Sequence, residues 1–396
     1  MDLSWIKDKG KTIPNRLNPI YAKIAAQKKF NERAKQDYMA ETPNIFIGRY
    51  GYPNINVGFL NAQDYNEHDN VKHWKQEAFS IPKIIDLRTN LINAPFKNQI
   101  KSFNNKLIEM AQEVSQASKP IDIEVNLMKK PSFSLSFNQK AAPHGPNVKF
   151  KKVQITENVN VKRHIDKVVS DTDLKAADAL TYLYKKGYDE HALIKLISVG
   201  NLGIKPQRKL VPTRWSITAT DDILGKNLIS QIKDYQWYDY AAYFGSYLGN
   251  YYLILCFPDA WEYEIFETIT IEDASFSTDY EPYEGRKKYA FDVTGGYYTV
   301  RLAILEKLKE LKRQSSVLAL RFINPAEYIA PLGVWVTREA SRNAMQNKPI
   351  TFASKELMLV YAKHLIKKKF NVNINNILGA SILLKNQKTQ KKLTDF

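Results

Sequence analysis

The sequence predicts a mixed α/β fold of the α+β kind, with a larger N-terminal region, a smaller C-terminal region and flexible basic tails. A chain of 396 residues is too long for one typical core. Its hydrophobic fraction of 44% and aromatic fraction of 12% allow it to bury a sizeable core. Helical and strand-like apolar spacings both occur along the chain. We expect a basic arm over 1–40, a larger domain over 41–275, a smaller domain over 280–384 and a tail over 385–396.

In the larger region, the apolar run Thr42–Gly48 predicts a strand that leads into the loop Gly48–Pro53, with Asn56–Phe59 as the returning segment. Helical periodicity predicts a helix over 99–118, and strict alternation predicts a strand over 121–128. The remaining expected elements are two helices over 171–187 and 189–200, a helix from 222 to about 235, and two strands over 250–257 and 262–267 that pair around Pro258–Asp259.

The smaller region begins near residue 281 with a glycine pair that opens a long helix. We expect this helix to run from Gly295 to Gln314. Strands are predicted over 317–323 and 334–336, and a last helix over 354–369.

The stretch Lys209–Asp222 is the strongest candidate site in the sequence. If it is extended up to a helix cap at Asp221 or Asp222, then Arg214, Ser216 and Thr218 share one face, and Trp215 and Ile217 lie on a buried face. A guanidinium and two hydroxyls suit a phosphate or a nucleotide, with Lys209 nearby. The two carboxylates would then serve as metal ligands or as a general base. The alternative is a buried salt bridge of Arg214 and an ordinary helix cap.

Three other segments carry weaker signals for anion binding. Gly295 and Gly296 could expose backbone N–H groups at a helix start, with Arg301 beside them, although a plain tight turn fits as well. Arg49, between glycines and tyrosines, could contact phosphate while a ring stacks on a base, or the tyrosines could pack on the body. Arg338, Glu339 and Arg342 have the spacing of an exposed ion-pair set or a phosphate clamp.

Charge and cysteine content restrict the function classes. The formal net charge of +17 favours a polyanionic partner, although a lysine-rich proteome is an alternative cause. The single cysteine, Cys256, excludes an intrachain disulfide and a cysteine zinc site. The cofactor is unknown; the nine acidic residues of Asp259–Glu284 could hold a divalent metal or form a solvated face. We find no membrane-length apolar run and no signal peptide, so we expect a cytoplasmic protein.

The last seven residues have the pattern of a docking peptide. In a 3₁₀ turn, Leu393 and Phe396 would form one apolar plug, with the amide of Gln390 one repeat upstream. This resembles the motif that tethers repair enzymes to the DNA sliding clamp, PCNA. The motif usually has two adjacent aromatics, so we expect weaker binding here. The alternative is a basic end with no partner.

Several motifs together resemble the archaeal Nre (novel repair) family. They are Gly48–Pro53, Lys209–Thr218, Gly295–Tyr298, and Pro331–Trp335 followed by Arg338-Glu339. The resemblance implies DNA repair coupled to the sliding clamp, but no particular reaction. Many relatives have a four-cysteine zinc module near the N-terminus, which this chain lacks. Two function classes stay open: an enzyme acting on DNA or a nucleotide, and a non-catalytic DNA-binding scaffold that brings other repair factors to the clamp.

Overall fold

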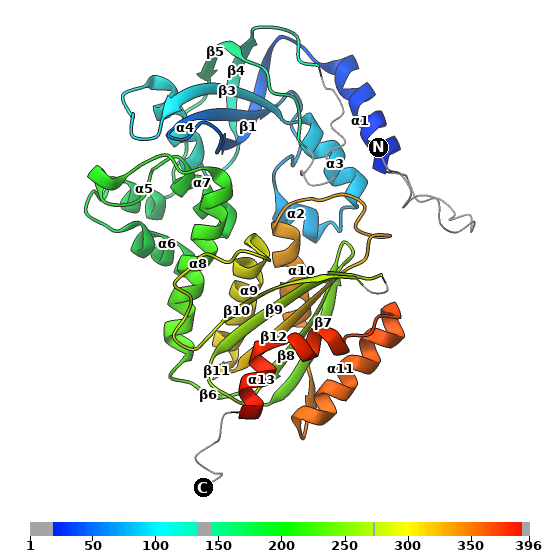
Figure 1. Cartoon of the computed structure of the whole chain (residues 1–396). Coiled ribbons are helices and arrows are strands. Elements are labelled where there is room, and N and C mark those ends of the chain that lie inside the picture. The colour runs from blue at the N-terminus through cyan, green and yellow to red at the C-terminus, as the bar shows by residue number, and fades with distance from the viewer. Residues whose placement is uncertain (1–18, 133–143, 272–273, 390–396) are drawn as a thin grey trace.

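The computed structural model describes residues 19–132, 144–271 and 274–389. Within these ranges it contains a five-stranded sheet, a six-stranded sheet and a small two-stranded sheet. The five-stranded sheet lies at the top of Figure 1 and the six-stranded sheet below it, with helices against both. The predicted mixed α/β class is therefore confirmed.

The upper sheet is antiparallel, with the strand order β3-β2-β1-β4-β5. Its strands are β1 (Asp37–Ile47), β2 (Asn54–Ala62), β3 (Ile92–Gln99), β4 (Ile121–Leu127) and β5 (Phe150–Ile155). Every second residue of β4 is buried, which confirms the strand predicted over 121–128. Helix α4 (Lys106–Gln116) packs on the buried face through Ile108, Ala111 and Val114. It is the central part of the helix predicted over 99–118.

Further helices lie beside this sheet or contribute to the core of the lower part of the molecule. They are α1 (Pro19–Arg33), α2 (Val71–Gln76), α3 (Ile81–Asn90), α5 (Arg163–Ser170), α6 (Ala176–Lys185) and α7 (Glu190–Ser198). Trp74 of α2 packs edge-on against Trp335, with ring centroids 5.5 Å apart. This contact belongs to a separate small core that ties the upper part of the molecule to the lower part.

The lower sheet has the strand order β10-β9-β12-β8-β7-β13, and only β9 and β12 run parallel. Its strands are β7 (Tyr240–Tyr247), β8 (Asn250–Phe257), β9 (Glu262–Ile269), β10 (Phe276–Glu281), β12 (Ser316–Ile323) and β13 (Ile350–Phe352). The two-stranded sheet joins β6 (Gln236–Trp237) to β11 (Arg313–Gln314). One sheet thus combines strands from both of the predicted domains.

The predicted pairing of the strands over 250–257 and 262–267 is wrong, because β12 lies between them. Seven of the eight residues of β12 are buried, so both of its faces are covered. A strand of this kind fits the centre of a sheet, with a neighbour at each edge. Proximity in sequence therefore does not decide the pairing here.

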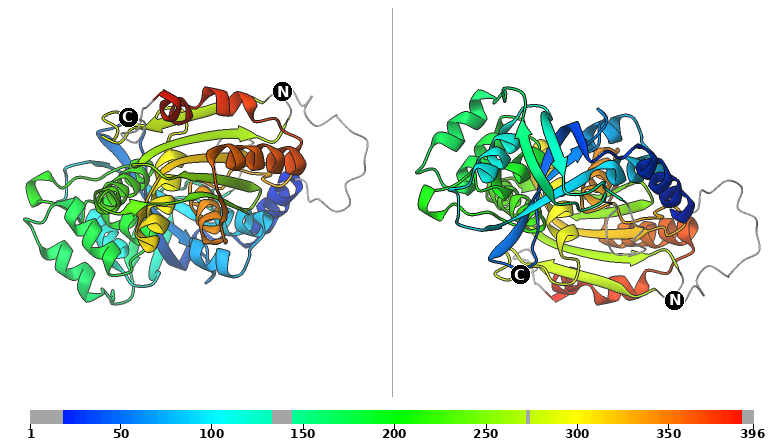
Figure 2. Two further views of the ribbon diagram at one scale, coloured as in Figure 1. Left: turned by 90° about the horizontal axis from the view of Figure 1, so that it is seen from below. Right: turned by 90° about the horizontal axis from the view of Figure 1, so that it is seen from above.

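Helices cover both faces of the lower sheet, as Figure 2 shows. One face packs on α8 (Thr213–Ile232), α9 (Gly295–Leu311) and α10 (Trp335–Gln346). The other packs on α11 (Lys355–Phe370), α12 (Asn375–Ala380) and α13 (Ile382–Thr389). The helices predicted from Gly295 and over 354–369 are confirmed. No helix in the described ranges is long and apolar enough to span a bilayer.

Two local predictions are wrong. Residues 213–221 are helical rather than extended, because α8 begins at Thr213 and not at an Asp221 or Asp222 cap. The hydroxyl of Thr218 donates to the Trp215 carbonyl, 3.1 Å away, so this β-branched residue is satisfied within the helix. Residues predicted as a strand over 334–336 instead begin α10, whose side chains Val336, Ala340 and Ala344 are fully buried at helical spacing.

Candidate functional site

The turn between β1 and β2 is fixed against the start of α8. The Ile47 N–H donates to the Thr213 hydroxyl, 2.9 Å away. Within the turn, the Asn54 N–H donates to the Gly51 carbonyl at 2.8 Å. Gly51 has a φ of +83°, and a Cβ there would lie 2.6 Å from the Asn54 carbonyl oxygen. Only glycine fits this position, so the turn has a defined shape.

Exposed aromatic and basic side chains gather where this turn meets α8. The rings of Tyr52 and Trp215 pack with centroids 5.3 Å apart. The Arg49 guanidinium lies 5.0 Å from the centre of the Tyr50 ring and donates to its hydroxyl at 3.2 Å. This hydrogen bond lowers the pKa of Tyr50, and the nearby charge of Arg214 adds a smaller effect of the same sign. Tyr50 is 77% exposed.

The segment before α8 brings further positive charge to this place. The Leu210 N–H donates to the Ile100 carbonyl at 2.8 Å, and the Ile100 N–H donates to the Pro53 carbonyl at 3.1 Å. These bonds set Lys101 and Lys209, both exposed, next to the turn. We call the whole cluster the aromatic–basic surface; it consists of Arg49, Tyr50, Tyr52, Lys101, Lys209, Arg214 and Trp215.

This arrangement suits a single-stranded or distorted nucleic acid. Exposed rings can stack on bases, and the guanidinium and ammonium groups can contact phosphates. The positive end of the α8 dipole lies at the same place, because the helix starts at Thr213. Sequence reasoning identified Arg49, Lys209 and Arg214. It missed Lys101, and it was wrong about Trp215, which is 43% exposed rather than buried.

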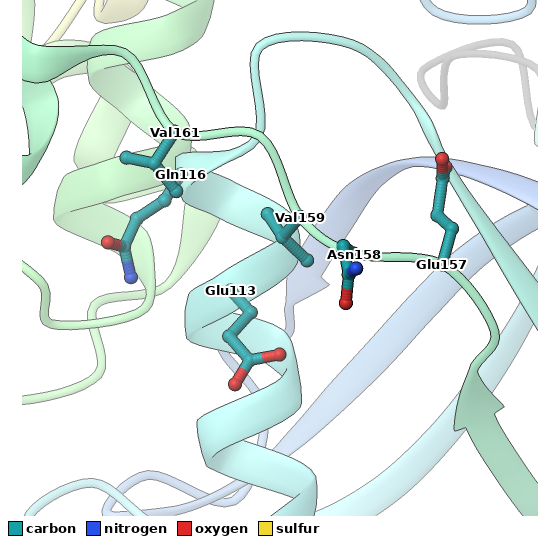
Figure 3. A pocket seen from close by; sticks show the side chains of 6 residues that line it. All are labelled: Glu113, Gln116, Glu157, Asn158, Val159 and Val161. Carbon is teal, nitrogen blue, oxygen red and sulfur yellow. The ribbon is translucent and has the colours of Figure 1, made fainter.

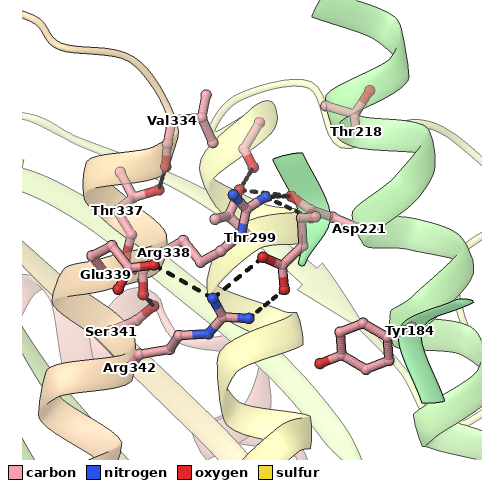
Figure 4. Close-up of polar contacts among 12 residues, drawn as sticks. Tyr184, Thr218, Asp221, Thr299, Val334, Thr337, Arg338, Glu339, Ser341 and Arg342 are labelled. Carbon is pink, nitrogen blue, oxygen red and sulfur yellow. Dashed lines mark hydrogen bonds and ion pairs between the residues drawn. The ribbon is translucent and has the colours of Figure 1, made fainter. Parts of the chain in front are cut away.

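The other candidates in the 209–222 stretch lie inside the protein or in ion pairs. Ser216 is fully buried, and its hydroxyl lies 3.3 Å from the Val211 carbonyl oxygen. Asp221 is also fully buried, and both its oxygens accept from Arg338, at 2.6 and 2.7 Å (Figure 4). The expected shared face of Arg214, Ser216 and Thr218 does not form, because a helix turns these positions in different directions.

The Asp221 ion pair belongs to a larger buried network that joins α7, α8, α9 and α10. Arg342 contacts Glu190 of α7 and Glu306 of α9, the latter at 2.6 Å. Burial acts to lower the pKa of Arg338, but the carboxylates of Asp221 and Glu190 more than offset this and raise it above its ordinary value. The predicted ion pairing is confirmed in part, because Arg342 pairs with Glu339 at 3.4 Å. The expected exposure is wrong, because Arg338 is buried and Arg342 is only partly exposed, and both arginines connect helices (Figure 4).

Arg301 connects α8 to α9 in a similar way. Its guanidinium contacts Glu281 at 2.5 Å and Asp222 at 2.6 Å, and only 1% of the residue is exposed. Asp222 also pairs with Lys226 at 2.7 Å. A Cβ on Gly225 would lie 3.1 Å from the guanidinium, so glycine gives Arg301 its space. We expected Arg301 to hold a phosphate, but the structure encloses it among carboxylates.

Gly295 and Gly296 are buried at the start of α9. A Cβ on Gly295 would lie 3.0 Å from a methyl group of Val334 and 3.9 Å from the methyl group of Thr218. The absence of a side chain thus lets α9 pack closely against α8 and the start of α10. This close packing accounts for a glycine at residue 295 without an anion.

A cavity of about 360 Å³ lies away from all of these residues, between the end of α4 and the segment that follows β5 (Figure 3). Its lining is acidic, amide and apolar: Glu113, Gln116, Glu157, Asn158, Val159 and Val161. Glu157 already pairs with Lys119 at 3.0 Å and accepts from the Asp122 N–H at 2.9 Å. Two carboxylates make this cavity unsuitable for a phosphate backbone.

Two further predictions concern metal binding and the tail. Among the residues that the structure describes, no group of three or more His, Cys, Asp or Glu side chains is placed to hold a metal ion. The clamp-binding candidates Gln390, Leu393 and Phe396 lie outside the described residues, immediately after α13.

Comparison with known proteins identifies the family. The family model described as "Archaeal Nre, N-terminal" matches residues 15–274, and "Archaeal Nre, C-terminal" matches residues 281–396. DNA repair protein NreA of Haloferax volcanii is 33% identical over 343 residues, which cover 81% of each chain. DNA repair protein NreB of Archaeoglobus fulgidus is 33% identical over 368 residues, covering 89% of this chain and 90% of the relative. NreA of the same organism is 34% identical over 339 residues, covering 83% and 84%. No solved structure matches the chain significantly. The two family models span nearly the whole sequence, and the chain therefore belongs to the archaeal Nre family.

Proposed function

We propose that this protein acts in DNA repair by binding DNA at the aromatic–basic surface and by attaching to the DNA sliding clamp through Gln390, Leu393 and Phe396. The observation that carries the DNA-binding proposal is the convergence of Arg49, Tyr50, Lys101, Lys209, Arg214 and Trp215 from three separate segments at the start of α8. The relatives named as DNA repair proteins agree with it.

Electrostatics favours a polyanion at this surface. The chain has 58 Lys and Arg residues against 41 Asp and Glu, and most of the arginines in its core are already paired with carboxylates. The cations of the aromatic–basic surface differ, because within the described residues neither Arg49 nor Arg214 forms an ion pair with a carboxylate. Phosphate groups would supply the missing negative charge.

The rings of the surface favour bases as the second contact. Base stacking on an aromatic side chain contributes about 1–3 kcal/mol per base, and it does not depend strongly on sequence. Tyr52 and Trp215 support each other, and Tyr50 lies beneath the Arg49 guanidinium. These contacts hold the rings in place before DNA arrives, which reduces the entropic cost of binding.

We favour DNA binding over turnover as the role of the 209–222 segment. Asp221 is enclosed and paired with Arg338, and Asp222 is shared between Arg301 and Lys226. These contacts support a structural role for both carboxylates, in agreement with the scaffold alternative. The clamp-binding tail would then bring the bound DNA and further repair factors to the clamp.

The test is an affinity measurement on the intact protein by fluorescence anisotropy, with single-stranded and duplex DNA. Two lost phosphate contacts predict a roughly 30-fold weaker affinity at 0.15 M salt for Arg49→Ala/Arg214→Ala. Tyr50→Ala should weaken single-strand binding roughly tenfold. The control Lys363→Ala/Lys368→Ala removes the same charge from exposed positions on α11, across the sheet, and should change affinity little. Equal losses in both double variants would contradict the proposed surface.

A further inference from the structure

The loop of residues 282–294, between β10 and α9, exposes an unusual group of side chains. Phe291 is 84% exposed and Tyr289 is 56% exposed. A phenylalanine in water forgoes the burial that normally stabilises a fold. Isolated exposed apolar residues are common, so the question is whether the rest of this loop holds Phe291 in a defined position.

Asp279, on the adjacent strand β10, organises the end of the loop. Its carboxylate accepts the backbone N–H groups of Phe291, Asp292 and Val293, at 3.3, 3.1 and 2.8 Å. It also pairs with Arg286 at 2.8 Å. Three consecutive backbone donors are thus fixed by one buried acceptor, which sets the backbone on both sides of Phe291.

Arg286 and Tyr298 organise the middle of the loop. The Arg286 guanidinium donates to the carbonyls of Tyr280, Lys288 and Tyr289, at 2.9, 3.3 and 3.2 Å. The Ala290 N–H donates to the Tyr298 hydroxyl at 3.0 Å. The loop that exposes Phe291 is therefore held in a defined conformation by many internal hydrogen bonds.

The loop runs along α8 towards the aromatic–basic surface. Near the C-terminal end of α8, the Lys233 ammonium donates to the Tyr283 carbonyl at 2.5 Å and lies 3.8 Å from the centre of its ring. The loop leads into Gly295, the first residue of α9, which lies against Thr218, one turn along α8 from Arg214. A helix of 20 residues is about 30 Å long, which corresponds to about nine base pairs of duplex.

The charges of the loop favour contact with bases over attraction of phosphates. Lys287 and Lys288 are exposed, but so are Glu284 and Asp292, so that the exposed charges balance. The loop thus fixes the backbone of an exposed apolar residue, Phe291, four positions before Gly295, which packs on α8 one turn from Arg214. Wedge residues that unstack base pairs are apolar side chains of this kind.

We propose that Phe291 inserts between bases of the DNA that the aromatic–basic surface holds, and so distorts or opens the duplex beside it. This inference rests on the proposed function, since it requires DNA to be bound. It assigns to the loop a role in sensing weakly stacked sites, because inserting a ring costs less where bases are mismatched or unpaired.

The experiment compares affinities for a perfect duplex, a duplex with a central mismatch and a single strand, across a salt series. Phe291→Ala should weaken binding to the mismatched duplex and the single strand roughly tenfold. It should leave the slope of affinity against salt unchanged, whereas Arg49→Ala/Arg214→Ala should lower that slope. Phe291→Trp should retain wild-type binding. Tyr65→Ala is the matched control: Tyr65 is 63% exposed, but burial and the negative charge of Asp122, Glu41 and Glu157 raise the pKa of its hydroxyl, so its surroundings are acidic.

Photochemical cross-linking gives a direct second measurement. DNA with 5-iododeoxyuridine at the mismatch should form a cross-link that mass spectrometry locates at Phe291 or Tyr289. Unchanged affinities of Phe291→Ala, together with cross-links elsewhere, would overturn the wedge while leaving the DNA-binding surface intact. A loss of clamp binding instead of DNA binding in Phe291→Ala would also overturn it, since the loop would then dock on a protein. Failure of the wild type to bind any of the three DNAs would overturn the proposed function as well.

Discussion

Removing Asp221 tests whether the buried ion pairs hold the fold or serve chemistry. Asp221→Ala leaves the Arg338 guanidinium buried without its two hydrogen bonds at 2.6 and 2.7 Å. An unpaired buried charge costs about 3–5 kcal/mol, and we expect the lower end because Glu190 also lies close enough to stabilise Arg338. The entropy of unfolding for 396 residues is about 0.8 kcal/mol per kelvin, so the melting temperature should fall by about 4 °C.

The assay is thermal and urea unfolding of the wild type, Asp221→Ala, Arg338→Met and the double variant Asp221→Leu/Arg338→Met. The double variant should recover most of the lost stability, because an apolar pair of similar volume removes the buried charge altogether. A wild-type melting temperature for Asp221→Ala, accompanied by loss of a DNA-processing activity, would refute the structural role and restore the catalytic interpretation of this carboxylate.

Three further outcomes follow from the structure and the sequence. Burial acts to raise the pKa of Glu190, but the positive charges of Arg342 and Arg338 outweigh burial and lower this pKa from 4.5 to about 2. Because the pKa is lower in the folded state, the ionised Glu190 stabilises the fold by roughly 3 kcal/mol near neutral pH, and this stability is lost as the pH falls from about 5 to 2. The acid unfolding of Glu190→Gln should lack this loss. Burial raises the pKa of the Cys256 thiol to about 12, so a thiol reagent should modify the native protein only at the rate of unfolding, and rapid labelling would contradict its position in the core. The wild-type tail should bind the sliding clamp with micromolar affinity. Calorimetry should show that Phe396→Ala loses about 2 kcal/mol or more of binding free energy. Clamp binding that survives Leu393→Ala/Phe396→Ala would exclude the tail as the clamp contact.

Local patterns were sufficient for elements whose periodicity is clear. Strict alternation identified β4, and the helices α9 and α11 begin at or next to the predicted residues. The start of α8 could not be predicted in this way, because its Thr- and Ser-rich first turns alternate like a strand. The hydroxyls of Ser216 and Thr218 bond to preceding carbonyls, which satisfies them within the helix. Burial of Ser216 and Thr220 against the rest of the protein then overrides their weak local preference for a helix.

The sequence predicted the candidate site residues that are exposed next to aromatic residues. It could not predict the roles of arginines whose carboxylate partners are distant in the sequence. Arg49 and Arg214 were recognised from their aromatic and polar neighbours. Arg301 was assigned to a phosphate, and Arg338 to an exposed ion-pair set or a phosphate clamp, because their carboxylate partners Asp222 and Asp221 lie 79 and 117 residues away in the sequence. Nothing in a linear pattern distinguishes an arginine that meets a buried carboxylate from one that faces solvent.

The most direct test of the account is the salt dependence of DNA affinity for the wild type and for Arg49→Ala/Arg214→Ala. Each phosphate contact contributes about 0.9 to the slope for duplex DNA, so the double variant should have a slope smaller by about 1.8. Lys363→Ala/Lys368→Ala should keep the wild-type slope. A slope that is the same in all three proteins would contradict the central claim that DNA binds where the β1–β2 turn meets α8.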